Sequence, residues 1–192
     1  MPCLEFKDIK ENPIEQFDCW FKQAIKSSEI LPNAAVLSTV DLNNYPKSRI
    51  VLIKAYDNNG FVFFSDTKSQ KIAHISNNNK VSLLFYWSSL EKQVKINGTV
   101  ERISWKSIAK YILNKSGGIG SWIKDKTKTL NIRCLLEDKI VDSILKHDNL
   151  RVDWSVYRIL PVWFEFWQGC EENLHEWVRY RKSGERWNIC VK

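Results

Sequence analysis

The sequence has no apolar run of about 18 residues, which is the length needed to cross a bilayer. Its opening residues, Met-Pro-Cys-Leu-Glu-Phe-Lys-Asp, lack the apolar core of a secretory signal. Its five cysteines form no CxxC pair and are odd in number, which argues against a zinc site and a disulfide framework. These absences predict a reduced, cytoplasmic protein that needs neither a metal nor a membrane. The cysteines are Cys3, Cys19, Cys134, Cys170 and Cys190.

Internal repeats, low-complexity tracts and an obvious interdomain linker are also missing. A chain of 192 residues with 44% hydrophobic residues can bury a sizeable core, but it is short for two domains. We therefore expect a single domain over residues 1–192, with a helical segment at 1–30 and strands at 155–192.

The apolar periodicity predicts a mixture of short strands and a few helices. Ile14, Phe17, Phe21 and Ala24 recur at helical spacing after Pro13, which favours an amphipathic helix. Alternating or apolar runs separated by Asn-, Asp- and Ser-rich turns favour antiparallel strands and a barrel. Strands are expected at 34–40, 48–56, 61–65, 81–87, 92–103, 157–167, 176–181 and 186–191, and further helices at 69–77, 104–114 and 136–147.

Residues 49–54 form a strand-like apolar run with a cation at each end. With a period of two, Arg49 shares a face with Val51 and Ile53, while Lys54 lies on the opposite face with Ile50 and Leu52. A cation inside a sheet is rarely kept without an anionic partner, so two faces suggest two different anions. The alternative is that both cations lie at solvated strand ends.

A second cationic stretch follows at residues 65–71, where a helix is expected to begin. Hydroxyls and lysines beside the free N–H groups of a helix N-terminus make a natural phosphate site. Ser69 could equally be an ordinary N-cap.

A net charge of +7 and nine tryptophans keep a nucleic-acid-binding module open as an alternative. Residues 177–182 interleave basic and aromatic side chains, as grooves for single-stranded nucleic acid do. The same residues also read as a strand with Trp177, Arg179 and Arg181 on one face and Val178 and Tyr180 on the other.

The order of these segments resembles the pyridoxamine 5′-phosphate oxidase family of flavoproteins. The resemblance covers almost everything from about residue 33 to 187, and it implies an α+β fold, a mainly antiparallel FMN-binding split β-barrel with peripheral helices. It also ranks nucleic-acid binding below a flavin enzyme. The matching segments are 49–54, 63–71, 81–87 with 90–94, Gly98, 101–102, Tyr111, 119–122, 165–169 and 174–175.

The resemblance implies an oxidase. In this family FMN oxidises the carbon that bears the amine or alcohol of a phosphorylated pyridoxine vitamer, and dioxygen reoxidises the flavin to give pyridoxal 5′-phosphate and hydrogen peroxide. The protein supplies position and charge. No Ser/His/Asp set, carboxylate pair or metal cluster is then required, and we identify none in the sequence.

Site residues follow from the resemblance alone. The cofactor shell would comprise Arg49, Ile50, Val51, Leu52, Lys54, Phe64, Ser65, Gln70, Lys71, Gln93, Lys126, Thr127, Trp167 and Trp177. The residues expected at the phosphorylated substrate are Lys54, Tyr111, Lys115, Ser116, Asn173 and His175, with His175 as the catalytic candidate.

The resemblance also implies a homodimer that shares its flavin between the subunits. The chain carries more large apolar residues than a small barrel easily hides, and exposed apolar patches usually mark contacts. The residues expected to contribute are Trp87, Trp122, Trp163 and Trp167.

Departures from the family pattern leave the substrate open. Gln70 stands where an arginine is usual, and Lys126 precedes Thr127 where a glutamine is usual. Lys115 replaces an arginine, so it can supply charge but not a planar two-pronged grip. Asn173 and Trp177 replace two further arginines. The alternatives are a diverged flavin oxidase, similar to those of phenazine biosynthesis, or a non-catalytic flavin-binding or nucleic-acid-binding protein.

Overall fold

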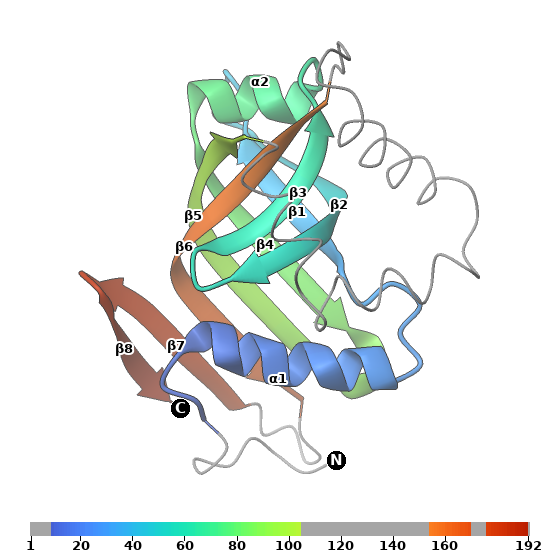
Figure 1. Cartoon of the computed structure of the whole chain (residues 1–192), viewed down its shortest axis with the longest axis vertical. Coiled ribbons are helices and arrows are strands. Elements are labelled where there is room, and N and C mark those ends of the chain that lie inside the picture. Colours follow the sequence, from blue (N-terminus) through green and yellow to red (C-terminus); the bar gives the residue numbers. More distant parts are fainter. Residues whose placement is uncertain (1–8, 105–153, 170–175, 192) are drawn as a thin grey trace.

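The computed structural model describes residues 9–104, 154–169 and 176–191. Its eight described strands form one antiparallel sheet in the order β3-β2-β1-β4-β5-β6-β7-β8, and an additional β3–β6 pairing closes the first six into a barrel (Figure 1). The elements are α1 (Pro13–Lys26), β1 (Ala34–Val40), β2 (Pro46–Asp57), β3 (Gly60–Asp66), α2 (Gln70–Asn77), β4 (Lys80–Trp87), the 3-10 turn η2 (Ser88–Leu90), β5 (Lys92–Ile103), β6 (Trp154–Gln168), β7 (Glu176–Ser183) and β8 (Arg186–Val191).

Helix α1 begins where the sequence predicts. Asn12 caps it by accepting a hydrogen bond from the Ile14 N–H at 2.9 Å, and Pro13 occupies the first turn, where its missing N–H costs nothing. The buried face of α1 covers one end of the barrel, while α2 lies at the opposite end (Figure 1).

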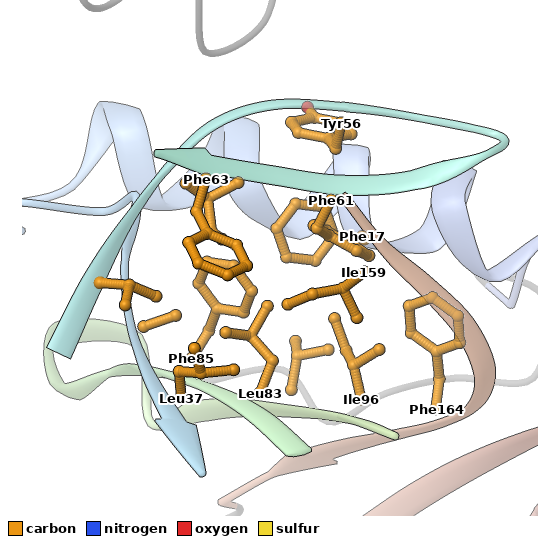
Figure 2. Close-up of a cluster of buried hydrophobic side chains, with 14 of the residues drawn as sticks. Phe17, Leu37, Tyr56, Phe61, Phe63, Leu83, Phe85, Ile96, Ile159 and Phe164 are labelled. Atoms are coloured by element: carbon orange, nitrogen blue, oxygen red, sulfur yellow. The ribbon is translucent and has the colours of Figure 1, made fainter. Parts of the chain in front are cut away.

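The core fills the barrel interior beneath α1. Phe17 lies edge-on to Phe61 at 4.9 Å and to Tyr56 at 5.0 Å between ring centroids, and it contacts Phe85 at 4.9 Å (Figure 2). Contacts of this kind add to the hydrophobic gain from burying each ring. The aromatic side chain of Phe17 therefore joins the helix to the barrel strands.

Strand β2 shows the predicted alternation only up to Ile53. Val51 and Ile53 are buried in the core, whereas Ile50 is 71% exposed. A β-bulge then places two residues, Lys54 and Ala55, opposite the single residue Val62 on β3. The register therefore changes at Lys54, one of the two cations that flank the apolar run at 49–54.

Strand β6 serves two parts of the sheet. Its first residues pair with β3 and close the barrel, and its last residues carry the β7–β8 hairpin. Val178 and Tyr180 face the core, as the alternation predicts, and the Tyr180 hydroxyl donates to the Lys10 carbonyl at 2.8 Å. The start of β6 lies three residues earlier than expected.

Trp87, one of the tryptophans expected to contribute to an exposed apolar surface of the dimer, is buried instead. Trp87 is only 1% exposed, and its indole N–H donates to the Pro32 carbonyl at 2.9 Å. Its expected role in a surface patch is therefore wrong. Trp163 and Trp167 are half-buried, and the large apolar residues that do lie exposed include Ile50 and Tyr86.

The remaining strand and helix predictions are confirmed to within a few residues. The helices expected at 104–114 and 136–147, and Trp122, fall almost entirely or entirely outside the described residues. In the part of the chain that is described, no helix is both long and apolar enough to span a membrane.

Candidate functional site

Four polar side chains gather where β2, β3 and the start of α2 meet. Lys71 Nζ donates to Ser69 Oγ at 3.2 Å, and Ser69 Oγ lies 3.0 Å from Ser65 Oγ. Ser65 Oγ in turn donates to the Asp66 carbonyl at 3.1 Å. Arg49 lies against the same helix, because it donates to Thr39 Oγ1, which is 3.0 Å from His74 Nδ1, one turn after Lys71 on α2. We call Arg49, Ser65, Ser69 and Lys71 the cationic cluster.

Ser69 has the position of an N-cap but not its usual bonding. It precedes α2 with extended backbone angles, yet its side chain makes no capping hydrogen bond. The hydroxyl is used instead by Lys71 and Ser65. The first turn of α2 contains no acidic residue, so the positive end of the helix dipole adds to the lysine charge.

Both cations of the cluster are half-buried, and this burial lowers the pKa of each. Burial lowers the pKa of Arg49. Burial and then the charge of Arg49 lower the pKa of Lys71, and Asp66 acts in the opposite direction. Two like charges are therefore held together at a cost that a bound anion would relieve.

A buried hydroxyl, that of Ser155, lies beside the cluster. Ser155 is paired directly with Ser65 across β3 and β6, which puts the two side chains on one face of the sheet. Ser155 is 1% exposed, and its Oγ has no partner among the described residues. Burial raises the pKa of Tyr157, two residues further along β6, while the charge of Arg102 acts to lower it.

Cations, hydroxyls and an orphaned buried donor suit an anion with several acceptor oxygens. A phosphate monoester has three such oxygens and up to two negative charges. The residues present therefore fit the phosphate end of a cofactor such as FMN.

A second group of predicted residues forms a row across β5, β6 and β7. Gln93 is paired with Trp167, and Trp167 is paired with Trp177. The guanidinium of Arg179 lies over the Trp177 ring, and Arg179 Nε donates to Glu165 Oε2 at 2.7 Å. Lys95 Nζ donates to the other oxygen of Glu165 at 3.0 Å. We call Gln93, Trp167 and Trp177 the β5–β7 row.

The other predicted residues on β2 and β3 flank the cluster. Lys54 is buried at the bulge, beside Ala55, which packs with Val62, Val156 and Phe64 in a small cluster separate from the main core. Leu52 is half-buried. Gln70 is exposed and lines a surface hollow together with Arg49.

The structure brings together only part of the predicted site. Arg49, Ser65 and Lys71 meet in the cationic cluster, but the β5–β7 row occupies a different stretch of the barrel wall. The remaining predicted residues lie outside the described residues. They are Tyr111, Lys115, Ser116, Lys126, Thr127, Asn173 and His175.

Several relevant residues were not among the predicted site residues. Ser155 can be placed only once β6 is known to pair with β3, and Thr39 and His74 can be placed only once α2 is docked on β1. Ser69, in contrast, could have been recognised from the hydroxyl-rich sequence at the start of α2. Within residues 9–104, 154–169 and 176–191, no group of three or more His, Cys, Asp or Glu could hold a metal ion.

Comparison with known proteins identifies the family of the chain. Residues 21–141 match the family model described as pyridoxamine 5′-phosphate oxidase. Residues 154–191 match the model described as the pyridoxine 5′-phosphate oxidase C-terminal dimerisation region.

Similar curated proteins carry the same name. The chain is 39% identical to the pyridoxine/pyridoxamine 5′-phosphate oxidase of Aliarcobacter butzleri over 97% of this chain and 91% of that one. It is 38% identical to the enzyme of the same name from Shewanella pealeana over 96% and 90% of the two chains.

Among solved structures, PhzG from Burkholderia lata 383, in complex with tetrahydrophenazine-1-carboxylic acid, shares the fold with a TM-score of 0.75. It is 21% identical, and the match covers 100% of this chain and 97% of that one. Taken with the barrel and the family models, these matches show that the chain belongs to the pyridoxamine 5′-phosphate oxidase family.

Proposed function

We propose that the protein is an FMN-dependent oxidase that converts pyridoxamine or pyridoxine 5′-phosphate to pyridoxal 5′-phosphate, with dioxygen as the electron acceptor and hydrogen peroxide as a product. The observation that carries the proposal is the cationic cluster, in which Arg49 and Lys71 lie near one another beside the hydroxyls of Ser65 and Ser69. Family membership supplies the reaction class. A cytoplasmic location is part of the same proposal.

The cluster would hold the phosphate of FMN. Arg49 and Lys71 would neutralise its charge, Ser155 would donate its hydroxyl proton, and the hydroxyls of Ser65 and Ser69 would rotate to donate theirs. Hydrogen bonds that involve a charged group contribute about 1.5–3 kcal/mol each, so two or three of them account for micromolar affinity or better. The bound flavin supplies the oxidising chemistry, and the chain orients the substrate against it.

Other residues would act on the flavin ring and the substrate. Gln93 would hydrogen-bond the edge of the ring, and Trp167 would pack beside it. Lys54, buried at the bulge, would bind the substrate phosphate together with Tyr111. The catalytic role of His175, and the roles of Ile50, Val51, Phe64, Thr127 and the other predicted residues, remain part of the proposal.

A homodimer would complete the site. The cationic cluster lies on β2, β3 and α2, and the β5–β7 row lies on strands that follow β1 and β4 in the sheet. Because β3 pairs with β6, the two groups are separated mainly along the strands: Ser155, which is opposite Ser65, and Trp167 are twelve residues apart on β6, or up to about 40 Å at 3.3 Å per residue. One flavin reaches both groups more easily when the row comes from a second copy, and the match to a dimerisation region supports this.

A second candidate is an oxidase of the same family with a different substrate. Trp177 favours it, because this large ring stands where an arginine is usual and is stacked against Arg179. An aromatic wall of this kind suits a flat apolar substrate better than a charged one. The fold likeness to PhzG is compatible with either substrate.

Flavin titration tests the cofactor, and peroxide release tests the reaction. Purified protein should bind one FMN per chain, and light scattering should give twice the chain mass of 22.6 kDa. Aerobic incubation with pyridoxamine 5′-phosphate, pyridoxine 5′-phosphate or a dihydrophenazine then distinguishes the two candidates by the substrate that yields peroxide. Folded protein that fails to bind millimolar FMN would rule out both.

Two variants test the cluster itself. Arg49→Met and Lys71→Met should each weaken FMN about 10- to 150-fold, the equivalent of one lost charged hydrogen bond. Lys80→Met, which removes an exposed lysine just after α2, is the matched control and should bind FMN normally. Equal affinities in all three variants would exclude the cluster as the phosphate site.

A further inference from the structure

Thr39 links two elements that contribute to the cationic cluster. Its Oγ1 accepts a hydrogen bond from Arg49 Nη1 at 2.7 Å and lies 3.0 Å from His74 Nδ1. Arg49 is on β2, and His74 is on α2, one turn after Lys71. Thr39 itself is on β1 and is 1% exposed, so this contact is shielded from water.

The direction of these hydrogen bonds follows from counting protons. Arginine only donates, so the Thr39 hydroxyl accepts from Arg49 and has one proton left to give. Its two possible acceptors are His74 Nδ1 at 3.0 Å and the Lys47 carbonyl at 3.5 Å, which is at the limit for a hydrogen bond. The shorter contact makes His74 Nδ1 the acceptor and places the imidazole proton on Nε2.

Arg49 is held by one nitrogen. Besides Thr39, its Nη1 donates to the Lys47 carbonyl at 2.8 Å and to the Leu37 carbonyl at 3.2 Å. Nη1 has two protons, which the three acceptors share, and these contacts restrict the rotation of the planar guanidinium while using only Nη1. Among the described residues, Nε and Nη2 of Arg49 make no hydrogen bond, so both donors can serve an anion.

His74 lies among charged groups from three elements. Lys71 precedes it by three residues on α2, Asp41 follows β1, and Lys47 and Arg49 come from β2 along the hollow that His74 lines. Among these groups, its hydrogen bond to Thr39 ties α2 to the residue that holds Arg49.

We propose that Thr39 and His74 are positioning residues that set the guanidinium of Arg49 for a phosphate and couple its placement to α2, which carries Lys71. The inference rests on the proposed function, in which the cationic cluster binds the FMN phosphate. In this arrangement the two residues would act on the phosphate through Arg49 and α2, without contact with the flavin ring. Their loss therefore affects the phosphate end of the ligand and leaves the ring end unchanged.

The test compares FMN with riboflavin, which has the same ring but no phosphate. Affinities are measured by flavin fluorescence for the full chain and for Thr39→Val, which keeps the shape of the side chain but removes the hydroxyl. We expect Thr39→Val to weaken FMN about 10-fold or more, the range for a lost hydrogen bond to a charged group, and to leave riboflavin affinity unchanged. Thr39→Ser, which restores the hydroxyl, should recover FMN binding.

His74 is tested with the same two ligands. His74→Leu removes the acceptor and should weaken FMN in the same direction, whereas His74→Asn places a side-chain oxygen near the position of Nδ1 and should recover part of the loss. The control is Ser38→Ala, which deletes the neighbouring hydroxyl on the opposite face of β1, where it contacts Ser48 Oγ at 2.9 Å. This control should bind both flavins normally.

The outcomes separate the positioning role from its alternatives. Parallel losses of FMN and riboflavin, with a lower unfolding temperature, would assign Thr39 a structural role only and overturn the inference. Unchanged FMN affinity in Thr39→Val and His74→Leu would also overturn it while leaving the proposed function intact. Failure of the unmodified protein to bind FMN would overturn both.

Discussion

The guanidinium carbon of Arg179 lies 3.9 Å from the centre of the Trp177 ring. Both residues are on β7, two positions apart, and share a face of the strand. Glu165, on the adjacent strand β6, accepts a hydrogen bond from Arg179 and fixes its orientation. Arg179 is thus engaged with both Trp177 and Glu165, and a nucleic-acid groove is not needed to explain the spacing of Trp177 and Arg179.

The Arg179–Trp177 contact should be measurable in a double-mutant cycle. Replacing each residue by alanine, singly and together, should give a coupling of about 0.5–1 kcal/mol in the free energy of unfolding, since the contact is partly exposed. The matched pair is Lys182 and Trp187, whose lysine nitrogen lies 5.9 Å from the ring centre and should couple more weakly. Urea unfolding measures both cycles, and equal couplings would contradict the stacking argument.

Glu165 should make stability depend on pH in the acid range. Burial tends to raise the pKa of its carboxyl, but hydrogen bonds from Arg179 and Lys95 outweigh burial and leave the pKa below its usual value. A lowered folded-state pKa means that the stabilisation is complete above the unfolded value of about 4.3 and is lost as the pH falls through the folded value.

Glu165→Gln should therefore lower the free energy of unfolding by about 1 kcal/mol at pH 7, a modest value because both cations are 45% exposed. The difference from the unmodified protein should shrink as the pH falls below about 4.3. Urea unfolding at several pH values provides the measurement. Glu101→Gln, at an exposed position on β5, is the control and should show no such trend.

The sequence contained enough local information to place most faces of the barrel. In a strand with one buried face, Val51 and Ile53 should be buried and Ile50 exposed. The structure shows this pattern. The same rule could have placed Trp87 inside, because it continues the buried series of Leu83 and Phe85 along β4. The prediction that Trp87 is exposed was wrong because it considered the size of the side chain and not the face of the strand on which it lies.

Other features depend on contacts between distant segments. The bulge at Lys54 exists only relative to the register of β3, and Ser155 meets Ser65 only because β6 closes the barrel. The contact between Thr39 and His74 likewise requires α2 to dock on β1. Periodicity along one strand contains no information about these pairings, so the sequence could indicate the cations but not the groups that hold them.

Barrel closure should be sensitive to the turn between β2 and β3. Gly60 has a φ of 123°, and a Cβ built there would lie 1.9 Å from the Ile159 carbonyl oxygen on β6. Gly60→Ala should lower the free energy of unfolding by more than about 3 kcal/mol, because backbone strain and a backbone clash add together.

Gly184 offers a matched control for that substitution. It has a φ of 59°, but a Cβ there would meet nothing within 4 Å. Gly184→Ala should therefore show only the strain of the left-handed conformation, about 1–2 kcal/mol. Denaturant midpoints compare the two, and similar losses at both positions would mean that the contact with Ile159 relaxes without cost.

Lys54 should separate substrate binding from cofactor binding. Lys54 lies at the bulge of β2 beside Ala55, whereas Lys71, Ser69 and Ser65 are hydrogen-bonded to one another at the start of α2 and on β3. If Lys54 binds the substrate phosphate, Lys54→Met should raise KM for pyridoxamine 5′-phosphate about 10- to 150-fold while changing FMN affinity little. Methionine keeps the length and suits burial, so the fold should tolerate it.

Steady-state peroxide release and FMN titration provide the two readouts, with Lys80→Met as the control for a lost charge. Equal losses in KM and FMN affinity would show instead that Lys54 belongs to the flavin site, and the two anions would then share one end of the barrel.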